Sequence, residues 1–202
     1  MGVPNDAEFQ SRVLLAALRL LEAPSGPVVE DFAEEAPISK EPDTVWACPV
    51  DLKKVNISPG DTDQLKEAFK DEIGQLLPWY DIAVKKRGRT TVGVSGLEIG
   101  EIGDFICTFL DGGVPQNINK DIPLGFAIKL AVDDLKAIYT EAVAAQPGGA
   151  IPESLDLVNW FWDGTIAGEL LLKIKDICVD SDDAGLQLFA KLLLVPMVRG
   201  TS

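Results

Sequence analysis

Histidine, a side chain that many enzymes use for catalysis, is missing from all 202 residues of this chain. Ser-His-Asp and Cys-His catalysis therefore cannot be assembled within one chain. The same absence excludes His-ligated haem, His-containing zinc sites and the His-containing di-iron site of helical bundles. An enzyme built on this sequence would have to use carboxylates, lysine, tyrosine, cysteine, a bound cofactor or a partner subunit.

The strongest candidate for a binding site is the one cluster of basic residues, K-K-R-G-R at 85–89. An arginine guanidinium can grip a phosphate or carboxylate through two hydrogen bonds, so this cluster fits an anionic ligand. Two aromatic residues and an acid precede it directly. The predicted ligand-binding set is Lys85, Lys86, Arg87, Arg89, Trp79, Tyr80 and Asp81.

The same cluster also fits the end of a helix, and we favour that interpretation. Cations near a helix C-terminus interact well with its dipole, and Gly88 is typical of the residue that ends a helix. The acidic connector at 28–44 can balance these charges. That connector can serve as an acidic docking segment, but a solvated loop laid over the domain is the simpler expectation.

Ser95 lies in G-V-S-G, which is close to the nucleophile elbow G-x-S-x-G. Leu97 occupies the position of the second glycine and there is no histidine to act as base, so we do not expect a nucleophile here. Ser95 and Glu98 have the spacing of a capping box, which predicts Ser95 as a helix N-cap.

Two acidic runs resemble metal-binding motifs but lack required ligands. Asp133–Asp134 begins like the D-D-x-x-D motif, yet Ala137 replaces its last acid, so we expect a solvated helix face. Asp180–Asp183 begins like a calcium loop, but Ala184 and Lys191 occupy ligand positions, so these acids are expected to cap a last helix. The sequence predicts no bound metal and no cofactor.

The three cysteines, Cys48, Cys107 and Cys178, are odd in number, widely spaced and set among apolar residues. This pattern predicts buried, reduced thiols and a cytoplasmic location.

The net charge of −14, from 18 basic and 32 acidic residues, restricts the partners. Nucleic acid and anionic membranes repel such a surface, whereas a basic protein would attract it. No uncharged apolar run reaches the length of a membrane span, and the N-terminus lacks a signal-peptide pattern.

Apolar residues recur at helical spacing along most of the chain. Helices are predicted at Ala7–Glu22, Thr62–Leu77 with a kink or new turn at Pro78, Ile99–Leu110, Ile122–Gln146, as a pair within Ala150–Val179 joined at 163–165, and at Asp183–Leu194. Thr44–Leu52 and Thr90–Val94 are strand candidates.

These elements predict a mainly helical, all-α fold of about seven helices packed around the 150–179 helix pair, with at most a minor two-stranded element. Residues 1–202 are expected to form a single domain. The favoured function is a binding or interaction protein with an apolar cavity or partner groove, and the partner can be a second copy of the chain in a homo-oligomer. The alternatives are a neutralising partner of a basic protein, and a His-independent enzyme or enzyme subunit with an anion site at 85–89. No catalytic residue is assigned, and a binding role is favoured over an enzymatic one.

Overall fold

The computed structural model describes residues 6–36, 52, 57–58, 60–112, 114–145 and 154–196. The chain divides into two units, Met1–Val45 and Trp46–Ser202. Every regular element among the described residues is helical, and seven are α-helices. The predicted all-α class is therefore confirmed, whereas the expectation of a single domain stays a prediction.

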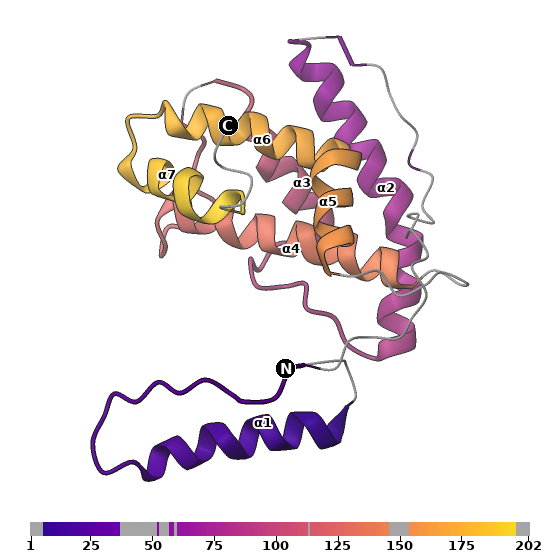
Figure 1. Cartoon of the computed structure of the whole chain (residues 1–202). Helices are drawn as coiled ribbons and strands as arrows, with labels where there is room; N and C mark the ends of the chain where they lie inside the picture. Colours follow the sequence, from indigo (N-terminus) through magenta and orange to yellow (C-terminus); the bar gives the residue numbers. More distant parts are fainter. Residues whose placement is uncertain are drawn as a thin grey trace. The chain divides into compact units, whose positions relative to one another are not determined.

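The N-terminal unit consists of one helix and a strap. Helix α1 (Ala7–Arg19) continues into a 3-10 turn, η1 (Leu20–Glu22), as the sequence predicts. Asp6 caps the helix, because its Oδ1 accepts a hydrogen bond of 3.0 Å from the Phe9 amide. The chain then turns and residues 27–36, the strap, run back beside α1 (Figure 1). Phe9 is buried and meets Phe32 of the strap edge to face, with ring centroids 5.9 Å apart.

The C-terminal unit holds the remaining helices (Figure 1). They are α2 (Thr62–Arg87), α3 (Ile99–Thr108), α4 (Leu124–Ala144), α5 (Ser154–Gly164), α6 (Ile166–Val179), α7 (Ala184–Phe189) and the π-helical turn η2 (Ala190–Leu194). These bounds lie within a few residues of most predicted ones. The periodicity of apolar residues was therefore sufficient to find the helices.

Helix α2 departs from the expected boundary, because it does not end at Leu77 but continues through Pro78 to Arg87. Proline lacks an amide and leaves the carbonyl four residues earlier, that of Gly74, without its helical partner. Both Gly74 and Pro78 are exposed, so water can reach that carbonyl. Leu76 and Tyr80, on either side of the proline, are both buried and hold the two halves of the helix to the core.

The core is shared between α4 and the predicted α5–α6 pair. Helix α4 packs against α2, α3, α7 and η2, and thirteen of its 21 residues are buried. Helix α6 packs against α2, α5, α7 and η2. Because α2 and α7 each contact both α4 and α6, they join these two helices into one core. The α5–α6 pair thus forms one part of this core, and α4 forms the other.

The joint between α5 and α6 depends on Thr165 and Gly168. The Thr165 hydroxyl accepts a hydrogen bond of 3.0 Å from the Gly168 amide and donates one of 2.6 Å to the Phe161 carbonyl. Thr165 thus caps the second helix of the pair, at the joint that the sequence predicts at 163–165. A Cβ atom at position 168 would lie 2.3 Å from the Phe161 carbonyl oxygen. Only glycine allows the two helices to approach this closely.

The segment before α3 differs from two predictions. Thr90–Val94 forms no strand, and the other strand candidate lies outside the described residues except for Leu52. Ser95 is not the N-cap of α3. Glu98 is the N-cap, and its amide donates a hydrogen bond of 3.0 Å to Glu101 Oε2 in a capping box three residues later than predicted. Ser95 is engaged elsewhere, by a buried carboxylate of α4.

Candidate functional site

The basic cluster forms the C-terminal end of α2, as the favoured interpretation predicts. Lysines 85 and 86 and Arg87 lie in its last turn, and Gly88 ends it in the left-handed conformation with φ of 68°. The Gly88 amide donates a hydrogen bond of 2.8 Å to the Val84 carbonyl. All four cations, including Arg89, are exposed. Their position suits the negative end of the helix dipole.

The other three residues of the predicted set do not join these cations in one pocket. Tyr80 is buried, and its hydroxyl lies 3.0 Å from Thr90 Oγ1. Trp79 packs against the core, whereas Asp81 is exposed. None of the seven residues lines either of the two cavities described next. Anion binding at 85–89 therefore stays a prediction.

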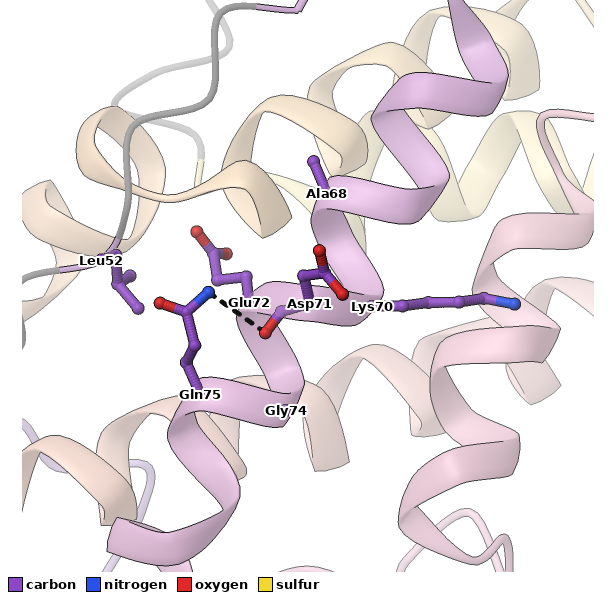
Figure 2. Close-up of a pocket in the computed structure, with 7 residues that line it drawn as sticks. All are labelled: Leu52, Ala68, Lys70, Asp71, Glu72, Gly74 and Gln75. Atoms are coloured by element: carbon purple, nitrogen blue, oxygen red, sulfur yellow. Dashed lines mark hydrogen bonds between the residues drawn. The ribbon is translucent and has the colours of Figure 1, made fainter.

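Two open cavities lie on the C-terminal unit. One, of about 460 Å³, runs along α2 and is lined by Leu52, Ala68, Lys70, Asp71, Glu72, Gly74 and Gln75 (Figure 2). In Figure 2 Glu72 and Gln75 lie toward Leu52, whereas Lys70 extends away from them. Lys70 pairs instead with Asp104 of α3, with 2.6 Å between Nζ and Oδ1. The other cavity, of about 550 Å³, is lined by Leu97, Glu101, Asp104, Phe105, Thr108, Gln116, Asn117, Ile118 and Lys120.

Glu72, in the first cavity, is a buried carboxylate with internal partners. Its Oε1 accepts hydrogen bonds from the Tyr139 hydroxyl at 2.7 Å and the Ala167 amide at 3.0 Å. Its Oε2 accepts one of 2.8 Å from the Ile166 amide. Burial raises the pKa of Glu72, and these three hydrogen bonds oppose the rise. The carboxylate thus satisfies the first amides of α6 and ties α2, α4 and α6 together.

Asp134 of α4 is fully buried, so the expectation of a solvated face is wrong for this residue. Its Oδ1 accepts hydrogen bonds from the amides of Gly93 at 2.8 Å and Val94 at 3.1 Å. Its Oδ2 accepts two from Ser95, 2.9 Å from the amide and 2.5 Å from the hydroxyl. These four donors replace the water that a buried carboxylate would otherwise need.

Glu141, two turns further along α4, is also buried and holds the preceding part of the same segment. It accepts hydrogen bonds from the Thr91 amide at 2.8 Å, the Thr91 hydroxyl at 2.7 Å and the Thr90 hydroxyl at 2.9 Å. Burial alone would raise the pKa of Glu141, but these bonds and the charge of Arg87 outweigh it and lower the pKa. We call Asp134, Glu141 and the segment 90–95 the carboxylate clasp.

Sequence reasoning missed the three buried acids, although a signal was present. Asp134 lies three residues after Ala131 and four before Ile138, and both neighbours are apolar and fully buried. Glu141 lies three residues after Ile138 on the same side. Glu72 likewise falls three residues after Phe69. An acid in line with an apolar stripe indicates a buried carboxylate that needs donors from elsewhere.

The N-terminal unit exposes a row of leucines. Its four members are Leu14, Leu15, Leu18 and Leu21, with exposed fractions of 52%, 54%, 57% and 81%. We call them the leucine stripe. The opposite side of α1 is already packed by the strap through Phe9 and Phe32, and Arg12 pairs with Glu34 of the strap at 2.8 Å. Helix α1 therefore has two apolar sides. The strap covers the side that carries Phe9, whereas the leucine stripe on the other side is exposed.

The remaining predictions concern acids and thiols. Asp183 caps α7 as expected, accepting hydrogen bonds from the amides of Gly185 at 2.7 Å and Leu186 at 3.0 Å. Cys107 and Cys178 are free and buried, as predicted, and Cys48 lies outside the described residues. Within the described ranges, no three acids or cysteines are grouped so as to hold a metal ion. No helix in that part of the chain has the length and apolar character needed to cross a membrane.

Comparisons with models of protein families, with curated proteins and with solved structures found no match to this chain.

Proposed function

We propose that this protein is a helical interaction protein whose leucine stripe docks into an apolar groove of a basic protein partner. The observation that carries the proposal is the exposure of Leu14, Leu15 and Leu18 on α1 and of Leu21 on the following turn η1, while the other side of α1 is already packed. Leucines at this spacing are the anchors of helix-in-groove recognition. Full burial of each leucine side chain contributes about 1.5–3 kcal/mol, so covering the stripe supplies a substantial driving force.

The charge of the same unit supports a basic partner. Residues 6–36 contain seven acidic and two basic side chains, and Glu34 already engages one of the two, Arg12. An acidic unit that carries an apolar stripe attracts a groove with a basic rim and repels an acidic one. A second copy of this chain carries a net charge of −14 and is therefore disfavoured as the occupant.

Site-specific cross-linking in the native host cell tests this proposal with the full chain. A photo-activated cross-linking amino acid is placed at Leu18, and at Arg19 as a control, because adjacent residues of a helix point about 100° apart. We expect Leu18 to cross-link to a partner whose isoelectric point is above neutrality, and Arg19 to do so weakly. A cross-link from Leu18 to the same chain, or to a second copy, would contradict the proposal.

The complex is then rebuilt from this protein and the purified partner. Replacing both Leu14 and Leu18 with Asp should weaken binding by about a hundredfold or more, since two anchors are lost. Leu188→Asp with Leu192→Asp is the matched control, because these leucines are 57% and 58% exposed but lie on α7 and η2. Binding that is insensitive to salt would contradict the basic character assigned to the partner.

The proposed compartment is the cytoplasm. The two buried cysteines are unpaired, and reduced thiols of this kind are typical of cytoplasmic proteins.

A further inference from the structure

Thr90 directly follows the basic cluster and is the first residue of the segment held in the carboxylate clasp. The proposed function uses neither of these two features. Arg87 lies three residues before Thr90 and Arg89 directly before it, and both are exposed. Thr90 itself is exposed and follows the end of α2 in irregular backbone. Its hydroxyl donates to Glu141 Oε2 at 2.9 Å and lies 3.0 Å from the Tyr80 hydroxyl.

We propose that Thr90 is a phosphorylation site for a protein kinase that selects basic residues on the N-terminal side of its acceptor. In this reaction Thr90 Oγ1 attacks the γ-phosphorus of ATP, the bond from that phosphorus to the bridging oxygen breaks, and ADP leaves. The hydroxyl proton passes to the catalytic base of the kinase. An acidic substrate groove is repelled by most of this chain but attracted by the four cations at 85–89.

The hydroxyl is engaged by Glu141, so the kinase acts on the segment when the clasp opens locally. Thr90 and Thr91 together make three hydrogen bonds to Glu141. Such exposed, irregular segments open far more often than the whole protein unfolds. The rate of phosphorylation therefore depends on the fraction of molecules in which the hydrogen bonds to Glu141 are open.

The phosphate also keeps that half open. It carries about −1.5 to −2 charges at neutral pH and cannot return to the side of the buried Glu141 carboxylate. The cations of the basic cluster lie within five residues and can pair with it instead. Asp134 still holds Gly93, Val94 and Ser95, because its donors do not involve Thr90. Phosphorylation thus moves the segment at 89–92 and leaves the rest of the clasp in place.

The first experiment treats the full chain with the catalytic subunit of cyclic-AMP-dependent protein kinase, Mg²⁺ and ATP, and locates the phosphate by mass spectrometry. We expect it on Thr90, with incorporation retained in Thr90→Ser and Thr91→Val and lost in Thr90→Val. Replacing both Arg87 and Arg89 with Ala should slow incorporation by about tenfold or more. Replacing the exposed Lys120 and Lys191 with Ala removes the same charge elsewhere and should change little.

The site assignment is overturned if Thr90 stays unmodified while a basic control peptide is phosphorylated. It is equally overturned if the phosphate lies on Thr91 alone, or if the arginine and lysine variants react at the same rate.

The second experiment measures amide hydrogen exchange in the phosphorylated and unmodified proteins. Exchange at the Thr91 amide should rise by about tenfold or more, because its acceptor Glu141 is released, while the Ser95 amide stays protected by Asp134. Unchanged protection at Thr91 would show that the phosphate leaves the clasp closed and would overturn the proposed switch. Loss of protection at Ser95 as well would show that the conformational change is not restricted to the Glu141 half of the clasp.

Discussion

Ser95 donates two hydrogen bonds to one oxygen of Asp134, from its amide at 2.9 Å and its hydroxyl at 2.5 Å, although 39 residues separate them. Asp134 and Glu141 stand seven residues apart on α4, which is about 10.5 Å along the helix. Asp134 accepts hydrogen bonds from Gly93, Val94 and Ser95, whereas Glu141 accepts them from Thr90 and Thr91. The two carboxylates therefore hold the two ends of one irregular segment, which is fixed to the helix by side chains and not by a sheet.

Removing the Asp134 carboxylate should destabilise the protein strongly. Asp134→Ala leaves three amides and a hydroxyl without their acceptor, and we expect a loss of about 3 kcal/mol or more in the free energy of unfolding. Urea denaturation at neutral pH measures it. The neighbouring Asp133 is the matched control, because it is partly exposed and pairs with Lys129 on the helix surface, so Asp133→Ala should cost about 0.5 kcal/mol or less. Equal effects at the two positions would refute the buried role of Asp134.

Most of the helical framework could be predicted from the sequence because it depends on local patterns. The apolar spacing within Ile99–Leu110 and the helix joint at 163–165 depend on residues close together in the sequence, and both expectations match the structure. The strand candidate Thr90–Val94 failed because its β-branched residues indicate extended backbone without saying what satisfies its amides. The acceptors are Asp134 and Glu141, some 40–50 residues away, and local propensity carries no information on them.

The candidate sites show the same limit. The basic residues at 85–89 could be assigned to a helix end because Gly88 follows Arg87 directly. Whether Trp79, Tyr80 and Asp81 share a pocket with them depends on tertiary packing, which buries Tyr80 and leaves Asp81 exposed. The exposure of the leucine stripe could not be predicted either, since the same periodicity describes a helix packed in a core.

Gly168 should tolerate no side chain. The Cβ atom of Gly168→Ala would lie 2.3 Å from the Phe161 carbonyl oxygen, so α5 and α6 would have to separate. We expect a loss of about 3 kcal/mol in the free energy of unfolding, measured by chemical denaturation. Gly74→Ala is the control, because nothing lies within 4 Å of its Cβ position on the exposed side of α2. That change should stabilise the protein by about 0.5–1 kcal/mol, and a loss there would contradict the helix geometry.

The thiols of Cys107 and Cys178 should react slowly in the native protein. Burial raises the pKa of each to about 11, so only about one molecule in a thousand carries a thiolate at pH 8. In a Cys48→Ser variant, which leaves only these two thiols, reaction with a chromogenic disulfide should be about a hundredfold slower than that of a free thiol. Unfolding in urea should restore the ordinary rate. Rapid reaction of either thiol before unfolding would show that its burial is incomplete.

Glu141 and Glu72 should change the pH dependence of stability in opposite directions. The pKa of Glu141 lies below its ordinary value of 4.5 in the folded protein, so the unfolded chain binds its proton first. Its contribution to stability is therefore present above that value and is lost as the pH falls through the folded pKa. The pKa of Glu72 is raised above the same value, so the folded protein binds that proton first. Its protonation adds stability as the pH falls.

Urea denaturation of Glu141→Gln, Glu72→Gln and wild type at about pH 6.5 and about pH 4 separates these effects. Each glutamine alters hydrogen bonding at both pH values, so the informative quantity is the change in unfolding free energy between them. Relative to wild type, Glu141→Gln should lose less stability on acidification, because it no longer has a carboxylate whose hydrogen bonds are lost on protonation. Glu72→Gln should lose more, because it lacks the gain from protonating a buried acid. A shift of both variants in the same direction would contradict the opposite environments of these two carboxylates.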